Sequence, residues 1–165
     1  MIRAARPHEY ARLRDIERRA GELFREIGMP EIADDEPPSA DHLASGAALY
    51  VATDDEDQPV GYALVDLVDG HAHLEQLSVV PEHGRQGIGR ALLQAATDWA
   101  SARGDAEITL TTFREVAFNA PFYAKHGFVA VEAQHLTDGL RAAVAKEAAE
   151  GMDTATRVVM SRSLQ

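Results

Sequence analysis

A glycine-containing turn is the segment of this 165-residue chain best suited to bind an anion. Residues 77–93 read LSVVPEHGRQGIGRALL, a pattern that predicts a strand, a turn and the start of a helix. A turn in this position presents unpaired backbone N–H groups at the positive end of a helix dipole. We therefore expect the turn to hold phosphate groups, with a pyrophosphate as the natural ligand.

The residue types in the turn fit that role. Gly84, Gly87 and Gly89 let the main chain approach an anion closely, and Arg85 and its neighbour at position 90 add positive charge. A Rossmann dinucleotide site would need a further glycine where the chain has leucine, and it would not follow three hairpin strands. We reject that interpretation, and a purely structural turn remains the alternative.

Three ionisable residues alternate along the strand that precedes the turn. His71, His73 and Glu75 have the period-two spacing that directs side chains to one face. A protonated amine has no free lone pair, so an enzyme that acylates it needs a base such as a carboxylate or a neutral imidazole. Two alternatives are a solvent-facing hairpin edge and a metal site, but the spacing suggests no further ligand, and we expect no metal.

The hydrophobic pattern predicts the elements that position these residues. Strands are expected at residues 2–6, 47–53, 59–68, 72–80, 108–113, 128–131 and 156–160. Helices are expected from residue 7 in two pieces, and at residues 88–103, 120–126 and 137–150, with a loop at residues 28–39 and a helix cap at Ser39 or Asp41. The strand at 108–113 should run parallel to the one before the long helix. This order predicts an α+β domain with a mixed sheet.

Composition limits the function classes. Hydrophobic residues make up 45% and charged residues 26%, which is typical of one globular domain over residues 1–165. The net charge of -11 disfavours nucleic acid and anionic membranes and favours a cationic substrate. The absence of cysteine excludes disulfides, thiolate metal sites and a cysteine nucleophile. No apolar run near the start is long enough for a signal peptide or membrane span, so we expect a cytoplasmic protein.

The turn resembles the coenzyme A loop of the GNAT acetyltransferases. The family signature is Gln or Arg, two residues, Gly, one residue, and Gly or Ala; here those places hold Gly84, Arg85, Gln86, Gly87, Ile88 and Gly89. The first place has glycine, and the arginine is shifted to the second. Downstream, residues 119–128 read NAPFYAKHGF, which resembles the family's Asn, Phe-Tyr and Gly-Phe motif.

The resemblance implies a three-layer α/β/α fold with a mostly antiparallel sheet flanked by helices. It also implies transfer of an acetyl group from acetyl-CoA to an amine by direct attack, without a metal. Family members commonly carry a catalytic glutamate or histidine where this chain has Glu75 and His73, and we rank Glu75 first as the base. Tyr123 is implied as the acid that protonates the departing thiolate, and Asn119 as a partner of the pantetheine arm.

The expected contacts with acetyl-CoA or coenzyme A extend from the strand to the second motif. A backbone N–H of Leu77 or Val79 is expected to stabilise the oxyanion. The full set of expected cofactor-binding residues is Leu77, Ser78, Val79, Gly84, Arg85, Gln86, Gly87, Ile88, Gly89, Arg90, Asn119 and Phe122. The alternative for the aromatic residues of the second motif is that they belong to the hydrophobic core.

The acceptor is left open by the sequence. Family likeness implies that residues 22–45 and 133–154 border the acceptor cleft, where the acids at 34–36 could hold an ammonium group or form a solvated face. The acceptor amine could be a small molecule or belong to a protein. A non-catalytic acyl-CoA-binding sensor or regulatory module is the alternative function, and exposed strand edges could support a homodimer.

Overall fold

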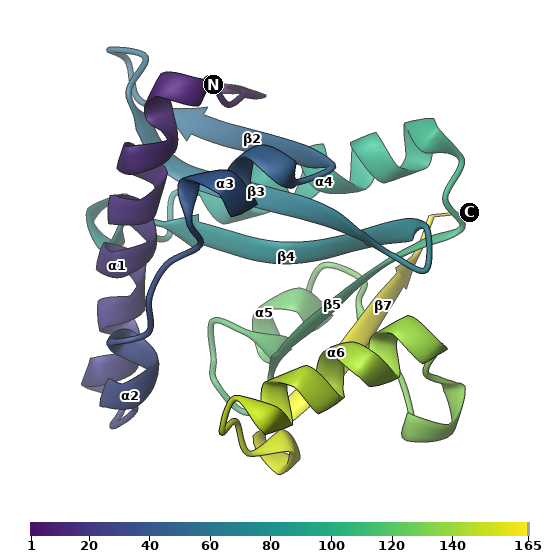
Figure 1. Cartoon of the computed structure of the whole chain (residues 1–165). Helices are drawn as coiled ribbons and strands as arrows, with labels where there is room; N and C mark the ends of the chain where they lie inside the picture. The colour runs from purple at the N-terminus through teal and green to yellow at the C-terminus, as the bar shows by residue number, and fades with distance from the viewer. Residues whose placement is uncertain (165) are drawn as a thin grey trace. The chain divides into compact units, whose positions relative to one another are not determined.

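The computed structural model describes residues 1–164 (Figure 1). The chain divides into two compact units: the first comprises residues 1–65 and 76–98, and the second comprises residues 66–75 and 99–165. The expectation of a single domain over residues 1–165 stays a prediction. Within residues 1–164, no helix is long and apolar enough to cross a membrane.

The strands form a mixed, mostly antiparallel sheet in the order β1-β2-β3-β4-β5-β7-β6. Antiparallel pairs join β1 to β2, β2 to β3, β5 to β7 and β6 to β7, whereas β4 and β5 are parallel. This α+β architecture confirms the predicted fold class, including the parallel strand after the long helix. The strands are β1 (Ile2–Ala4), β2 (Ala48–Thr53), β3 (Pro59–Val68), β4 (His71–Val79), β5 (Glu107–Phe113), β6 (Val129–Ala130) and β7 (Arg157–Ser163).

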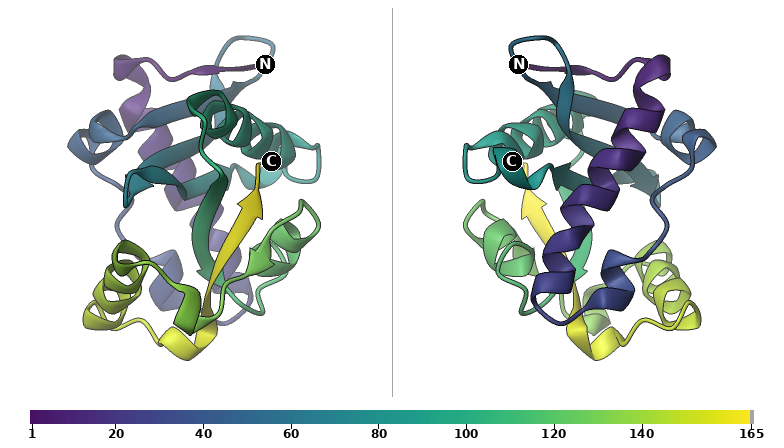
Figure 2. Two further views of the ribbon diagram at one scale, coloured as in Figure 1. Left: turned by 90° about the vertical axis from the view of Figure 1, so that its right-hand side faces the viewer. Right: turned by 90° about the vertical axis from the view of Figure 1, so that its left-hand side faces the viewer.

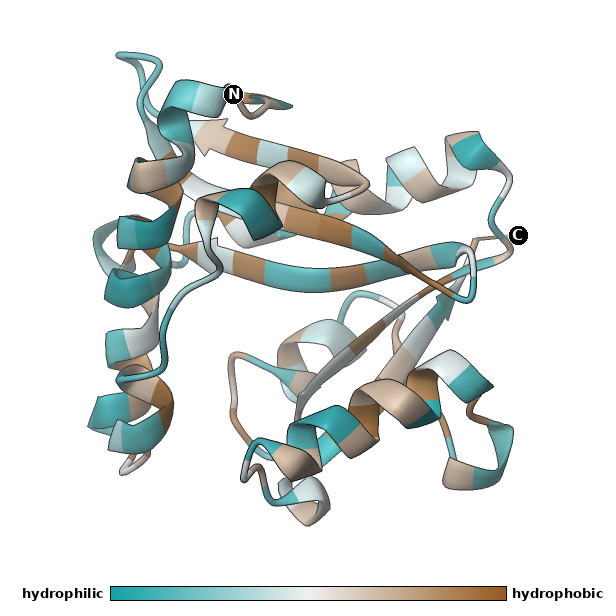
Figure 3. Cartoon of the chain, viewed as in Figure 1, coloured by the Kyte–Doolittle hydropathy of each residue, from teal (hydrophilic) through white to brown (hydrophobic). Residues whose placement is uncertain are grey.

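The first unit packs helix α1 (Tyr10–Glu26) against its strands, as the right-hand view of Figure 2 shows. Leu13 and Ile16 on α1 are fully buried, and they join a core cluster with strand residues such as Val51 and Leu64. Figure 3 shows hydrophobic residues concentrated along β2 and β3, while much of α1 is hydrophilic. The amphipathic spacing of α1 therefore explains which of its faces is buried.

Two short helices follow α1 before the second strand. Helix α2 (Pro30–Ala33) has proline at its first position, and α3 (Ala40–Ser45) begins after Ser39, whose hydroxyl accepts a hydrogen bond from the His42 backbone N–H. Of the two expected caps, the structure uses Ser39. The single turn of α2 lies inside the segment that was expected to be a loop.

The second unit contains β5, β6 and β7 with helices α5 (Ala120–Ala124) and α6 (Asp138–Ala149). Its α6 begins after Thr137, whose side chain accepts a hydrogen bond from the Leu140 N–H, and Asp69 accepts another from Gly139. Helix α4 (Ile88–Arg103) contributes residues to both units. Four short 3-10 helices complete the described elements: η1 (Pro7–Glu9), η2 (Pro81–His83), η3 (Ala133–His135) and η4 (Thr154–Thr156). The first lies within the helix expected from residue 7, and the other three were not predicted.

Candidate active site

The glycine-containing turn of the first unit leads from η2 into α4. Arg85 and Gly87 have positive φ angles of 60° and 80°, so the chain alternates between backbone conformations at this point. Within residues 1–164, no protein group accepts a hydrogen bond from the backbone N–H of Arg85, Gln86 or Gly87. Consecutive free N–H groups before a helix form an anion-binding concavity.

The side chains around the turn are open to solvent. Those of Arg85, Gln86 and Arg90 are exposed, and His83 Nδ1 lies 3.3 Å from Gln86 Oε1. Gly84 replaces the Gln or Arg of the family signature, and a Cβ atom there would lie 3.2 Å from the Pro81 carbonyl oxygen. Glycine therefore avoids a tight contact at this position, and the positive charge near the turn comes from Arg85 and Arg90.

The strand segment before the turn contacts an ionisable residue that the sequence analysis missed. The Ser78 hydroxyl donates to the Glu17 carboxylate, with O···O distances of 2.7 and 3.1 Å, and the Tyr62 hydroxyl donates at 3.0 Å. Burial raises the pKa of the Glu17 carboxyl, against the effect of these two hydrogen bonds. Its position one residue after Ile16, on the buried stripe of α1, was the available sequence signal.

In the second unit, His73 is a buried residue of β4. Its Nδ1 atom lies 2.8 Å from Thr109 Oγ1 on β5, and its side chain is 9% exposed. Burial lowers the pKa of His73 to about 4, although the negative charges of Asp66 and Glu147 act in the opposite direction. The imidazole is therefore neutral near pH 7, but it is a weak base.

Glu75 and His71 differ from His73 in their exposure. His71 is exposed, with its Nδ1 atom 3.9 Å from the Asp105 carboxylate, whereas Glu75 is half-buried. Because side chains alternate along β4, Glu75 and His73 lie on the same face of the strand. The His73 ring contacts the Thr109 side chain of β5, so the Thr109 side chain also lies on this face. In the described part of the chain, no three His, Asp or Glu side chains are grouped as metal ligands.

The second motif forms an aromatic cluster around α5. Tyr123 is 8% exposed, and its ring meets those of Phe122 and Phe128 edge-on at centroid distances of 5.2 and 5.7 Å. Asn119 precedes the helix, and its side-chain amide donates to the Phe118 carbonyl oxygen at 3.0 Å. These aromatic side chains take part in packing, and the roles assigned to Tyr123, Phe122 and Asn119 in donor binding and catalysis stay predictions.

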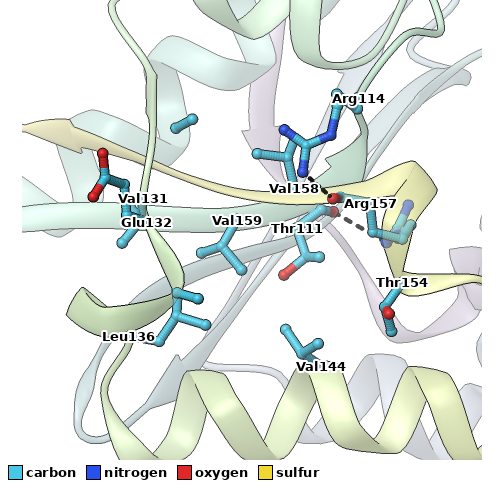
Figure 4. Close-up of a pocket in the computed structure, with 12 residues that line it drawn as sticks. Thr111, Arg114, Val131, Glu132, Leu136, Val144, Thr154, Arg157, Val158 and Val159 are labelled. Atoms are coloured by element: carbon cyan, nitrogen blue, oxygen red, sulfur yellow. Dashed lines mark hydrogen bonds between the residues drawn. The ribbon is translucent and has the colours of Figure 1, made fainter.

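A cavity of about 270 Å³ lies on the second unit, as Figure 4 shows. It is bordered by β5, β7, α6 and the segment between β6 and α6, and Thr111 lies on its β5 side. This segment belongs to the stretch 133–154 that the family resemblance associates with the acceptor. The cavity itself was not predicted, because its walls come from segments up to about fifty residues apart.

The sequence model of the Acetyltransferase (GNAT) family matches residues 10–128, which is most of the chain. The chain therefore belongs to the GNAT family of acetyltransferases. The name of the family describes acetyl transfer. Among curated proteins, the chain is 26% identical over 81 residues to the uncharacterized N-acetyltransferase YobR of Bacillus subtilis; the match spans 49% of this chain and 33% of that protein.

Solved structures share the fold over the whole chain. The PaiA N-acetyltransferase of Thermoplasma acidophilum, in complex with coenzyme A, has a TM-score of 0.69 at 19% identity, covering 99% of this chain and 98% of that one. The N-acetylglutamate synthase of Neisseria gonorrhoeae, complexed with coenzyme A and N-acetyl-glutamate, has a TM-score of 0.74 at 17% identity, covering 100% of this chain and 35% of that one. At these identities the likeness shows the fold.

Proposed function

We propose that this protein transfers an acetyl group from acetyl-CoA to an amine by direct attack of the amine on the thioester. The observation that carries the proposal is the run of free backbone N–H groups from Arg85 to Gly87 at the start of α4. They are supplemented by the exposed guanidinium groups of Arg85 and Arg90. This arrangement suits the pyrophosphate of coenzyme A.

Two structures lend weight to the choice of donor. Both the PaiA enzyme and the N-acetylglutamate synthase were solved with coenzyme A, and both share the fold of this chain. For this protein we assign donor contacts to the backbone of Leu77, Ser78 and Val79, the turn from Gly84 to Arg90, and the side chains of Asn119 and Phe122.

The proposed reaction needs one base and one acid. Glu75 accepts a proton from the ammonium group, and the freed nitrogen lone pair forms a bond to the thioester carbonyl carbon. A backbone N–H of Leu77 or Val79 stabilises the oxyanion. When the C–S bond breaks, the sulfur leaves as a thiolate and takes a proton from the Tyr123 hydroxyl. The nitrogen loses its second proton as the amide forms, and that proton restores the Tyr123 hydroxyl by way of solvent.

His73 is less suited than Glu75 to act as the base. Its buried ring has a pKa of about 4, which makes it a poor acceptor for the proton of an alkylammonium group with a pKa near 10. Its Nδ1 atom is also engaged with the Thr109 hydroxyl. We therefore assign His73 to the positioning of the β4–β5 face and keep Glu75 as the proton acceptor.

Donor binding is the first step to test. A ligand at about 100 times its dissociation constant stabilises a protein by roughly 2.7 kcal/mol, so acetyl-CoA should raise the melting temperature clearly. Gly89→Glu, which adds a carboxylate to the phosphate site, should abolish the shift. The matched control Ala102→Glu adds the same charge to the exposed far end of α4 and should retain it.

A turnover assay distinguishes a transferase from a non-catalytic acyl-CoA-binding sensor. Release of free coenzyme A thiol in the presence of a panel of amines is expected for a transferase, and Glu75→Gln should lower it. Donor binding without thiol release on any amine would favour the non-catalytic sensor. No stabilisation by millimolar acetyl-CoA would remove the proposed donor site.

A further inference from the structure

The carboxylate of Glu17 joins helix α1 to two strands of the first unit. Its Oε2 atom accepts hydrogen bonds from the Tyr62 hydroxyl of β3 at 3.0 Å and from the Ser78 hydroxyl of β4 at 2.7 Å. Its Oε1 atom lies 3.1 Å from the same serine oxygen. The three residues belong to one compact unit, and we call them the Glu17 cluster.

The Glu17 cluster contains no positive charge. No Arg, Lys or His side chain among residues 1–164 forms an ion pair with Glu17, and burial raises the pKa of its carboxyl. The buried carboxylate of Glu9, in the same unit, is instead held by the Arg3 guanidinium group at 2.7 Å. A carboxylate withdrawn from water without a cation costs stability, and apolar residues can often replace buried charges without loss. Stability alone therefore does not explain a carboxylate at position 17.

Ser78 lies in a stretch of β4 whose two backbone edges have different surroundings. On the β3 side, the Val80 N–H donates to a β3 carbonyl oxygen at 2.9 Å. The Ser78 carbonyl group also faces β3, because a Cβ atom at Gly61 would lie only 3.0 Å from its oxygen. Backbone groups of successive residues alternate between the two edges of a strand. The N–H groups of Leu77 and Val79 therefore point to the edge away from β3.

The N–H groups of Leu77 and Val79 find no backbone acceptor at that edge within residues 1–164. Strand β5 pairs with β4 only at His73 and Leu74, and no loop carbonyl oxygen accepts from either N–H. Both groups are therefore available to a ligand. The proposed reaction assigns the oxyanion to one of them, so their direction decides how well the developing negative charge is stabilised.

The direction of these N–H groups depends on the residue between them. Ser78 is 7% exposed, and its hydrogen bond to Glu17 fixes the side-chain rotamer and connects the strand to α1. Because β5 does not pair with this stretch of β4, the contact with α1 gives support that a neighbouring strand would otherwise provide. A misplacement of about 1 Å in an active site can lower a rate by about a hundredfold.

We propose that Glu17 is a positioning residue of the acetyltransferase, which acts through Ser78 to hold the N–H groups of Leu77 and Val79 in the direction that stabilises the oxyanion. The inference rests on the proposed function and adds a residue to it. In this role the Glu17 side chain accepts hydrogen bonds, and it neither binds the acceptor amine nor takes its proton. The reaction therefore requires the acceptor oxygen of the side chain and not its charge.

Two substitutions at position 17 separate the acceptor oxygen from the charge. Glu17→Leu removes both oxygens and should lower kcat about tenfold or more in the thiol-release assay. The KM for acetyl-CoA should stay unchanged, because the lost stabilisation belongs to the transition state. Glu17→Gln keeps an amide oxygen for the two hydroxyl groups, so its kcat should stay within about threefold of the wild type.

The two variants also give the result that would overturn the inference. Equal losses of kcat in Glu17→Leu and Glu17→Gln would mean that the charge itself is needed, as it would be for binding or deprotonating the amine. The matched control Glu22→Leu makes the same change at an exposed glutamate of α1 that pairs with Arg25. It should change neither kcat nor the KM for acetyl-CoA.

A double-mutant cycle tests whether Glu17 acts through Ser78. Ser78→Ala should lower kcat by a factor similar to that of Glu17→Leu, and the variant with both substitutions should lose no more than either single one. Losses that multiply would show two independent effects and contradict the proposal. Ser78→Ala deletes a single hydroxyl group, so it serves alone if Glu17→Leu does not fold, and an unchanged kcat would then overturn the inference.

A measurement without turnover distinguishes failure of this inference from failure of the proposed function. In amide NMR spectra, acetyl-CoA should shift the signals of Gln86 and Gly87 in the turn and those of Leu77 and Val79 in β4. In Glu17→Leu the shifts in β4 should be lost, while those in the turn remain. Shifts in β4 that persist in this variant would overturn the positioning role and leave the donor site intact. Absence of every shift in the wild type would remove the donor site and this inference with it.

Discussion

The buried imidazole of His73 should make the free energy of unfolding depend on pH. Well above pH 6.5 the ring is neutral in both states, so it contributes no pH dependence there. As the pH falls from 6.5 toward 4, the unfolded state binds a proton that the folded state excludes, and stability is lost. At about 1.4 kcal/mol per pKa unit, the lowering from 6.5 to about 4 corresponds to roughly 3 kcal/mol.

The variant His73→Asn isolates this contribution. Asparagine cannot titrate, and its amide reaches about as far as Nδ1, so a hydrogen bond to Thr109 can remain. At about pH 7.5 the variant should be less stable than the wild type because it leaves a cavity. Urea unfolding at several pH values should then show the wild type losing roughly 3 kcal/mol relative to the variant by about pH 4.

His71→Asn is the matched control, because it makes the same chemical change on the same strand. The side chain of His71 is 62% exposed, and its contact with Asp105 is a surface pair at 3.9 Å. Its pH-dependent difference from the wild type should stay within about 1 kcal/mol. Stability curves of the wild type and His73→Asn that run parallel from pH 7.5 to 4 would refute the burial argument.

Three further substitutions test other parts of the structure. Glu17→Gln should be more stable than the wild type at pH 7 and lose that advantage toward pH 4.5, because burial raises the pKa of the carboxyl and disfavours its charged form; urea unfolding at the two pH values checks this. Gly139→Ala should break the hydrogen bond from the Gly139 N–H to Asp69, because the added Cβ would lie 2.6 Å from the carboxylate oxygens; the Asp69 side chain can turn away and alanine has the better helix propensity, so a thermal melt should change by the equivalent of less than about 1 kcal/mol. Tyr123→Phe should reduce kcat about a hundredfold with little change in acetyl-CoA affinity, and unchanged turnover in a thiol-release assay would remove its role as the acid.

Helix α4 shows where the sequence was sufficient. Its apolar spacing predicted residues 88–103, and the structure has the helix at Ile88–Arg103. Both ends are marked locally, by the glycine-containing turn before it and by Gly104, with φ of 89°, after it. A strong amphipathic pattern between two local signals leaves little for distant contacts to decide.

Helix α1 shows the opposite case. The sequence predicted two helical pieces, whereas the structure has one helix, Tyr10–Glu26, that passes through Gly21. A Cβ atom at Gly21 would lie 3.6 Å from the Ala33 carbonyl oxygen, an ordinary contact distance, so α2 packs beside Gly21 without requiring glycine there. The cost of glycine in a helix, about 1 kcal/mol, is offset by packing that only the folded chain reveals.

The candidate site also contains one part that could be predicted from the sequence and one part that could not. The glycine-containing turn before α4 could be located from the sequence because it lies within one short segment, where glycine spacing directly limits the backbone. The burial of His73 could not, because it depends on β5 and α6, which are distant in sequence. Alternation predicted only that His73 and Glu75 share a face, and whether that face is buried depends on what covers it.

The charge of the acceptor is not decided by composition alone. A net charge of -11 favoured a cationic acceptor, and the acids at residues 34–36 were a candidate site for it. In the structure, an oxygen of the Glu36 carboxylate lies 3.5 Å from a nitrogen of the Arg14 guanidinium group, and Asp34 forms an ion pair with Arg25. Positive charges of α1 therefore offset these two acids. Arg114 beside the cavity has no such partner among the described residues. Unpaired charged groups next to a bound ligand affect its binding more than the net charge of the protein does, because solvent and salt screen charges beyond about 10 Å.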